Sequence, residues 1–256
     1  MTTDSADLAA AEFTLVGRLV DASNDTFLVR CQSPSGEYDA VYKPISGEQP
    51  LWDFPHGNLA SREVAAYEVS QRAGFEVVPT TVLVPDGPCG PGMLQRWIEV
   101  SEDPATDVVH VSRPNRVPAG DFRIVRGIDQ HERPIVVSHA DDPRLRRMAL
   151  FDAVVNNSDR KGGHILITRD RVYGVDHGVT FHTDPKLRTL LWGWAGEPLN
   201  EIERELIDRS VGCLDALASY LTDAEIEAAE YRCLRLVEEG FPLPGRDWPA
   251  IPWPPL

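Results

Sequence analysis

Short apolar runs alternate with turn-forming stretches at the start of the chain. Runs rich in Val, Leu, Phe and Tyr occupy residues 13–20, 26–32 and 38–44, and the turn-like stretches DASND and SPSGE separate them. This spacing predicts three antiparallel strands in a meander. The same pattern would suit a piece of any β-sandwich, so these runs alone do not select a fold.

A helical segment follows these strands and narrows the choice of fold. Asn58 is a candidate N-cap, apolar residues keep helical spacing as far as Val69, and Gly74 is placed to end the helix. Residues 77–84 and 93–100 read as two further strands on either side of the turn PDGPCGPG. The predicted order over about the first 100 residues is therefore β-β-β-α-β-β.

The second half is predicted to be mainly helical. An acidic cap followed by Pro143 marks the start of a helix that runs through RLRRMALFDAVVN and ends at the polar cluster NNSDRKGG. HILI and VYGV predict a two-strand hairpin across TRDR, and residues 197–239 predict helix with acidic faces. Between residues 101 and 142, the runs VVHV, FRIV and RPIVVSH are candidates for short strands.

These patterns divide the chain into two lobes and two terminal segments. Residues 13–100 form a lobe with an antiparallel sheet and one helix, and residues 101–240 form a mainly helical lobe that contains the hairpin. Residues 1–12 are predicted to be a loose acidic leader, because nothing in them repeats with a useful period. Residues 241–256 carry six prolines and predict a tail without regular structure.

The tail has two alternative roles. Its Trp248 and Trp253 lie among prolines, which is typical of a polyproline segment that a partner protein recognises. The alternative, which we favour, is that the tail lies in a groove of its own domain.

Composition excludes some functional classes. The chain has 25 Lys+Arg against 40 Asp+Glu, a formal net charge of −15 and a pI of about 4.8. Such a protein repels phosphate backbones and anionic membranes, so nonspecific nucleic-acid binding and stable membrane anchoring are not expected. No run of 18 apolar residues occurs and the first residues are acidic, which predicts a soluble, cytoplasmic protein.

The cysteines fit this expectation. Four are present, with no CxxC or paired zinc-ligand spacing, and they predict ordinary thiols in a reducing compartment: Cys31, Cys89, Cys213 and Cys233.

The acidic charge is unevenly distributed. Residues 113–171 carry 12 basic and 8 acidic residues, a local net charge of +4. The basic residues nearest the polar cluster are Arg144, Arg146, Arg147, Arg160 and Lys161. They could be solvated charges on a helix face, or they could attract a polyphosphate or an acidic substrate.

Four residues in a fixed order are candidates for chemistry. Lys43 ends a strand, Glu63 lies in the next helix, Asp159 lies in the polar loop, and Asp176 follows a strand. Phosphoryl transfer from ATP requires a lysine on the phosphates, a glutamate that holds it, an aspartate near the nucleophile and another on the metal. Each residue taken alone also fits a surface charge or a turn former.

The arrangement around the polar loop strengthens this interpretation. In VVNNSDRKGGHILI…VYGVDHGVTF, an Asp, a residue five positions later, a strand pair and an Asp-x-Gly follow one another. On these motifs the chain resembles the phosphatidylinositol 3/4-kinase superfamily, most closely type II phosphatidylinositol 4-kinases, as a bacterial member. Bacterial HipA-type kinases are similar in outline, less closely.

The resemblance extends from about Lys43 to Trp194 and implies a two-lobed kinase-like fold. SREVAAYEVSQRAGFEVVPTT resembles the helix that pairs with the lysine, GMLQRWIE the hinge strand, and LRTLLWGWAGEPL the Trp-rich helix after the metal-binding segment. The resemblance implies ATP and Mg²⁺ or Mn²⁺ as cofactors.

The resemblance also implies roles for individual residues. Lys43 would contact ATP phosphates and pair with Glu63, and Asp159 would be the catalytic aspartate. Asp176 would bind the metal. Asp152 also has a counterpart in the family, and we expect it to buttress the loop; direct catalysis is the alternative. The residues implied along the adenine, with hydrogen bonds from the hinge backbone, are Gln95, Arg96 and Trp97.

Two positions depart from the family pattern. His164 stands where the family has an asparagine metal ligand, and imidazole suits transition metals better than Mg²⁺. We therefore expect His164 to face the metal and activity to prefer Mn²⁺; the alternative is that His164 only packs. The loop between the first two strands has no glycine, so Ser23 and Asn24 are the candidate phosphate donors there, opposed by Asp21 and Asp25.

The sequence thus predicts an ATP-dependent phosphotransferase. The cysteine-rich palmitoylation segment of type II lipid kinases is missing, so a protein Ser/Thr or a soluble hydroxyl compound is the expected acceptor. AMP transfer on the same fold and a weakly catalytic nucleotide-binding scaffold are the alternatives.

Overall fold

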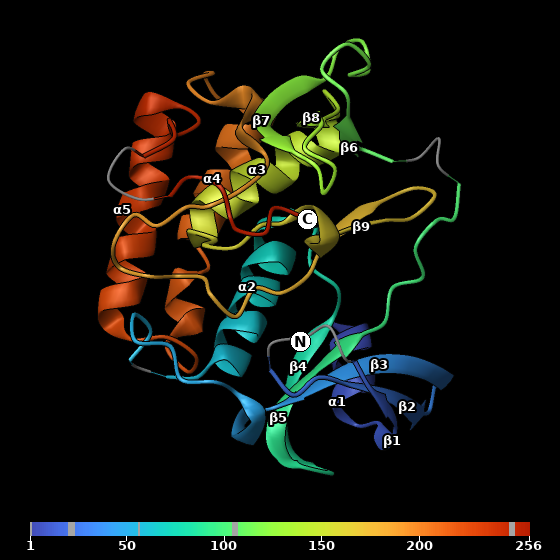
Figure 1. Cartoon of the computed structure of the whole chain (residues 1–256). Coiled ribbons are helices and arrows are strands. Elements are labelled where there is room, and N and C mark those ends of the chain that lie inside the picture. Colours follow the sequence, from blue (N-terminus) through green and yellow to red (C-terminus); the bar gives the residue numbers. More distant parts are fainter. Residues whose placement is uncertain (1, 20–23, 56, 104–106, 246–248) are drawn as a thin grey trace.

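Two lobes make up the computed structural model, a sheet lobe and a largely helical lobe (Figure 1). The structure describes residues 2–19, 24–55, 57–103, 107–245 and 249–256. The elements of the sheet lobe are α1 (Thr3–Ala9), β1 (Glu12–Arg18), β2 (Phe27–Ser33), β3 (Gly36–Pro44), η1 (Ile45–Gly47), α2 (Leu59–Ala73), β4 (Thr81–Gly87) and β5 (Gly90–Arg96).

The helical lobe begins with a small sheet and continues with helices around a hairpin. Its elements are β6 (Val109–Ser112), β7 (Phe122–Ile128), β8 (Pro134–His139), α3 (Pro143–Val155), η3 (Gly162–His164), β9 (Ile165–Ile167), β10 (Val172–Gly174), η4 (Trp192–Trp194), α4 (Glu201–Val211), η5 (Leu214–Leu217) and α5 (Asp223–Glu239). The predicted α+β, two-lobed architecture is confirmed, and the predicted hairpin is present as β9 and β10.

The sheet of the first lobe has the strand order β1-β2-β3-β5-β4, with every neighbouring pair antiparallel. One face carries a small core that includes Val29, Tyr42 and Leu94. Helix α1 covers this face and contributes Leu8, which is fully buried.

The prediction of a loose leader was therefore wrong for residues 3–9. Thr2 caps the helix by accepting a hydrogen bond from the Ser5 amide. Seven residues are too few to show a helical period, and a helix this short depends on tertiary packing, here of Leu8 against the sheet.

Helix α2 connects the two lobes. Asn58 caps it by accepting from the Ser61 amide, and Gly74 ends it in the left-handed region at φ 87°, both as predicted. Near its start, Ala60 and Val64 pack against Met93 of the sheet. Its later residues pack in the main core together with α3, so a single helix contacts both the sheet and the helical lobe.

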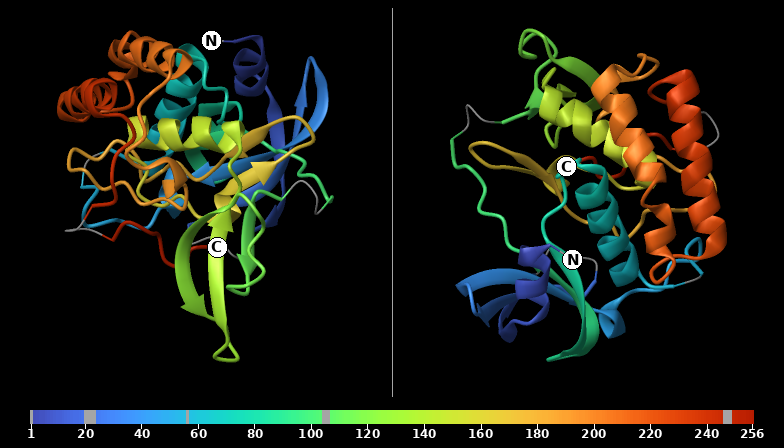
Figure 2. Two further views of the ribbon diagram at one scale, coloured as in Figure 1. Left: turned by 90° about the horizontal axis from the view of Figure 1, so that it is seen from above. Right: turned by 180° about the vertical axis from the view of Figure 1, so that it is seen from behind.

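The three candidate strands between residues 101 and 142 form the sheet β6-β8-β7. In the left view of Figure 2 this sheet projects from the body of the helical lobe. Helix α3 begins as predicted, with Asp142 as the N-cap and Pro143 in the first turn.

Two predicted helices differ from the structure. The helical stretch 197–239 is broken into α4, η5 and α5, because Asn200 and Thr222 each begin a new helix with a capping box. The Trp-rich segment forms only the short turn η4 rather than a helix.

The described part of the tail is irregular, as predicted, and packs on its own domain. The Thr189 amide donates to Ala250 O and the Gly162 amide donates to Pro255 O. These contacts match the groove alternative; Trp248 lies outside the described residues.

The described residues contain neither a disulfide nor a membrane-spanning helix. All four cysteines are free thiols, and only Cys89 is exposed. No helix within the described residues combines the length and the apolar character that a membrane crossing requires.

His139 generates a prediction about acid stability. Burial lowers its pKa, and the neutral ring donates from Nδ1 to Ala140 O (2.9 Å) and accepts from the Gly193 amide at Nε2 (3.2 Å). In the unfolded chain the His139 ring is protonated below about pH 6.5. Each unit by which folding lowers the pKa corresponds to ~1.4 kcal/mol of free energy. Stability from this group is thus present above that pH and is lost as the pH falls below it.

We expect His139→Phe to flatten the fall in unfolding free energy between about pH 6.5 and pH 5. Denaturant titrations at several pH values measure this slope. His131→Phe, at the exposed tip of the same sheet, is the control that keeps the original slope. Equal slopes in His139→Phe and the unchanged chain would contradict the assignment.

Candidate active site

A cavity of about 300 Å³ lies between the lobes. Its walls are formed by the residues before β2, the end of β3, the residues after η1, the first turns of α2, the loop 156–164 and the residues after β10. We call the loop 156–164 the Asp159 loop. The predicted site residues that line this cavity are Asn24, Lys43, Glu63, Asp159, His164 and Asp176.

Lys43 lies at the centre of this cavity. Its Nζ donates to Glu63 Oε1 at 2.8 Å and to Asp176 Oδ1. Burial alone would lower the pKa of Lys43, but the two carboxylates outweigh burial and raise it. The lysine therefore stays charged, and the predicted pairing of Lys43 with Glu63 is present in the geometry.

Glu63 also fixes the segment that carries Asp176. Its Oε2 accepts from the His177 amide at 2.9 Å, so α2 is tied to the residues after β10. Asp176 itself has φ 59°, which is a strained backbone for a residue with a side chain. Lys43 is the main cause that lowers the pKa of Asp176, against the opposing effect of burial.

His164 presents a lone pair to Asp176. Its Nδ1 lies 2.9 Å from Asp159 O, and because a carbonyl can only accept, Nδ1 carries the hydrogen. Burial lowers the pKa of His164 against the opposing effect of Asp176, and in the neutral ring the lone pair is on Nε2, 3.3 Å from Asp176 Oδ2. Two acceptors that converge at this distance form a suitable site for a cation between them.

This donor set fits a divalent ion that the nucleotide also coordinates. In the described ranges, no group of three or more His, Cys, Asp or Glu residues could hold a metal. The protein would supply His164 and Asp176, and the other ligands would be phosphate oxygens and water. Mg²⁺ and its relatives are commonly bound in this way, by one or two protein groups plus substrate phosphates.

The Asp159 loop is held from inside the helical lobe. Arg160 and Asp152 are fully buried, and the Arg160 guanidinium donates to both Asp152 carboxylate oxygens at 2.9–3.2 Å. Asn157 Nδ2 also donates to Asp152, while Asn157 Oδ1 accepts from the Asp159 amide. These contacts match the buttressing role that the sequence favoured for Asp152.

The burial of Arg160 corrects the interpretation of the basic stretch. Arg160 is neither a solvated charge nor available to a polyphosphate. On α3, Arg144 pairs with Asp142, Arg146 pairs with Glu203, and Arg147 donates to Gly74 O. Of the basic residues singled out there, only Lys161 lines the cavity.

Lys161 is therefore a site residue that the sequence analysis did not assign. Its Nζ lies 3.0 Å from Asp159 Oδ2, and the Asp159 carboxylate is about one-third exposed, at 31%. Its position two residues after Asp159 on the same loop was the sequence signal that could have identified Lys161 as a site residue.

The loop before β2 meets the residues after η1. Asn24 lines the cavity, but its Oδ1 accepts from the Gln49 amide at 2.8 Å. Glu48 caps α2 by accepting from the amides of Leu59 and Ala60, both at 2.9 Å. Glu48 and Gln49 are thus further lining residues that the sequence analysis missed, and Ser23 lies outside the described residues.

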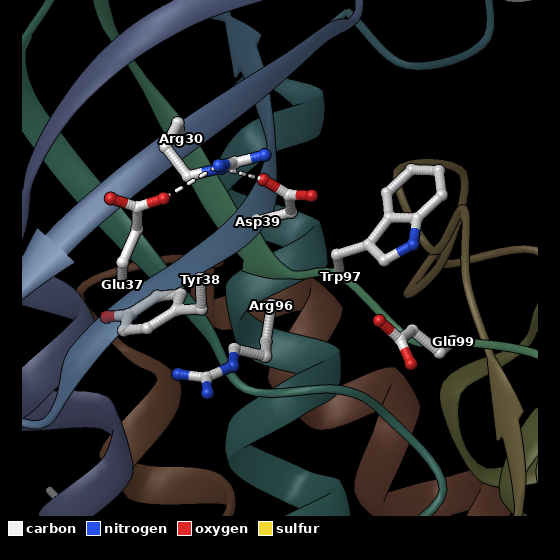
Figure 3. A pocket seen from close by; sticks show the side chains of 7 residues that line it. All are labelled: Arg30, Glu37, Tyr38, Asp39, Arg96, Trp97 and Glu99. Carbon is white, nitrogen blue, oxygen red and sulfur yellow. Dashed lines mark hydrogen bonds and ion pairs between the residues drawn. The ribbon is translucent and has the colours of Figure 1, made fainter.

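The three predicted adenine contacts do not line this cavity. The β3–β5 register places Gln95 on the same sheet face as Lys43. The buried side-chain amide of Gln95, however, donates from Nε2 to Thr81 Oγ1. The backbone amides of Arg96 and Trp97 donate to Thr80 O and Asp39 O. Figure 3 shows the side chains of Arg96 and Trp97 at a separate hollow of about 410 Å³.

Comparison with known proteins identifies relatives of this chain. No family model matches it. It is 45% identical over 270 aligned positions to "Protein Rv2133c" of Mycobacterium tuberculosis (strain ATCC 25618 / H37Rv), covering 98% of this chain and 95% of that protein. The chain belongs to the Rv2133c family.

Solved structures show that this Rv2133c family member has a kinase-like fold. The Golgi casein kinase crystal structure matches with a TM-score of 0.53 and 14% identity, over 92% of this chain and 74% of that chain. The structure of hydra Fam20 with sugar matches with a TM-score of 0.50 and 12% identity, over 91% and 86%. At these identities the likeness concerns the fold alone.

Gly174 of this Rv2133c family member provides a test of the buried Arg160 side chain that holds the Asp159 loop. A Cβ at Gly174 would lie 2.7 Å from the Arg160 Nη2. We expect Gly174→Ala to destabilise the fold by about 1–3 kcal/mol, the usual range for overpacking. Denaturant unfolding measures the change.

The matched control is another strand glycine. At Gly127 the nearest atom to an added Cβ is Ile135 Cγ1, at an ordinary 3.9 Å. Gly127→Ala should therefore leave stability nearly unchanged. If both variants unfold at the same denaturant concentration as the unchanged chain, Arg160 is not confined as described.

Proposed function

We propose that this protein is an ATP-dependent phosphotransferase that uses a divalent metal ion. The observation that supports it best is that four separate parts of the chain bring Lys43, Glu63, Asp159, His164 and Asp176 together around one cavity on a kinase-like fold. Placement within the phosphatidylinositol 3/4-kinase superfamily is part of this proposal and rests on the sequence motifs. A cytoplasmic location is likewise a proposal.

In the proposed mechanism, Lys43 binds phosphate oxygens while Glu63 keeps its ammonium group oriented. Asp159 Oδ accepts the proton of the attacking hydroxyl, and Lys161 offsets negative charge beside it. A divalent ion held by Asp176 and His164 would neutralise charge on the phosphates. Asp152 and Arg160 keep the Asp159 loop in place and do not touch the reacting atoms.

The proposed acceptor is a hydroxyl on a protein Ser/Thr or on a soluble compound. The Asp159 carboxylate is partly exposed at the cavity, so an acceptor can approach it from solvent. The missing palmitoylation segment and the acidic surface argue against an inositol lipid in a membrane.

ATP labelled at the α- or the γ-phosphate tests the proposal. The purified protein is incubated with each label, alone and with a cell extract, and transferred label is measured. Transfer from the γ-phosphate supports a phosphotransferase, whereas transfer from the α-phosphate alone would establish AMP transfer. No transfer with Mg²⁺ or Mn²⁺, combined with a higher melting temperature in ATP, would establish a binding scaffold.

The two aspartates should separate catalysis from binding. We expect Asp159→Asn to lower transfer by about 10²–10⁴-fold, the usual contribution of a positioned base, and to leave ATP binding largely intact. Asp176→Ala should lose metal-dependent ATP binding as well. Single-turnover assays and calorimetry measure the two properties.

The control for both is Asp170→Asn, an exposed carboxylate in the turn of the hairpin, which should change neither property. Near-normal turnover of Asp159→Asn would show that the catalytic loop has been misplaced.

His164 should set the choice of metal. An imidazole nitrogen favours Mn²⁺ over Mg²⁺, whereas an amide oxygen favours Mg²⁺. We expect higher activity with Mn²⁺ in the unchanged chain and a lower Mn²⁺/Mg²⁺ activity ratio in His164→Asn. Equal or better rates with Mg²⁺ in the unchanged chain would contradict His164 as a ligand.

A further inference from the structure

The tail of the chain lies directly against the Asp159 loop. The Gly162 amide donates to Pro255 O at 2.9 Å. Ala250 O accepts from the Thr189 amide at 3.1 Å and from Trp192 Nε1 at 2.9 Å. The tail is therefore attached at both ends of residues 250–256, with Pro252 buried between them.

Gly162 is closely enclosed at this junction. A Cβ there would lie 2.9 Å from Leu256 Cδ2 and 3.4 Å from Val109 Cγ1 of β6. Figure 1 shows the end of the chain, marked C, beside β9 and near β6. The first residue of η3 is thus held between the tail and the small sheet.

The turn that is held here carries the candidate metal ligand. Gly162 and Gly163 precede His164 in η3, and consecutive glycines have wide conformational freedom. Inside the turn, the His164 amide donates to Lys161 O at 3.2 Å. A turn of this composition needs contacts from outside to keep one orientation, and the hydrogen bond to Pro255 O is such a contact.

The tail contributes little to the main core. Phe241 belongs to the buried core cluster, but no residue of the described part after it does. The loss of residues 250–256 should therefore affect the Asp159 loop more than the fold as a whole.

We propose that residues 250–256 position the metal ligand: by holding Gly162, they keep the η3 turn oriented so that His164 Nε2 faces Asp176. This inference rests on the proposed function, because it assumes that a metal–nucleotide complex binds in the cavity. Pro255 and Leu256 are positioning residues, since they act through Gly162.

The test compares the full chain with a chain that lacks residues 250–256. Calorimetry measures the Mn²⁺ dissociation constant in the presence of a non-hydrolysable ATP analogue, analogue binding without metal, and the melting temperature. We expect Mn²⁺ binding to weaken about tenfold, as for the loss of a group that orients a metal ligand. Metal-free analogue binding should be unchanged, and a peptide of residues 249–256 added separately should restore Mn²⁺ affinity.

A point variant covers the case in which the shortened chain does not fold. Leu256→Ala removes the side chain next to Gly162 and should weaken Mn²⁺ binding in the same direction, by less. Leu243→Ala, at a leucine that is 71% exposed near the start of the tail, is the matched control and should change nothing.

Two results would overturn the positioning role. One is unchanged Mn²⁺ affinity in the shortened chain, or in Leu256→Ala if the shortened chain is unfolded. The other is a joint loss of metal and metal-free analogue binding that the peptide does not restore. A full chain that binds no metal–nucleotide complex would instead overturn the proposed function, and this inference with it.

Discussion

One buried guanidinium holds the candidate site together. Arg160 is fully buried, and all five of its N–H groups have acceptors: Asp152, the carbonyls of His164 and Val175, and His177 Nε2. A buried charge is tolerated only when it is paired and fully hydrogen-bonded, so these partners cannot separate without a large free-energy cost. The partners come from α3, η3 and the residues around Asp176, which fixes the loop with Asp159 relative to the candidate metal ligands.

The same constraint explains what the sequence could and could not predict. Lys43, Glu63, Asp159 and Asp176 stand at the ends or in the first turns of well-marked elements, so their order along the chain could be matched to the motifs of a kinase-like family. Arg160 resembled a surface charge because its acceptors are backbone carbonyls and residues on other elements, which no local pattern shows.

The hinge residues and α1 illustrate two further limits. Gln95 to Trp97 carry the motif of a hinge strand, but they do not line the cavity, and neighbouring backbone carbonyls use the amides of Arg96 and Trp97. That use depends on register, which the composition of a strand does not specify. In α1 the decisive feature was one buried leucine, because seven residues are too few for a period.

The charges in the cavity give the argument for a metal. Lys43 and Lys161 face the carboxylates of Glu63, Asp159 and Asp176, and these are all paired within the site. Asp25 and Glu48 also line the cavity, so two lysines stand against five carboxylates, and this excess of negative charge would repel free ATP. A divalent ion held by Asp176 and His164 Nε2 would reduce that excess and would remove the opposition of two lone pairs at 3.3 Å. The acidity of the cavity thus means that a cation would strengthen nucleotide binding there.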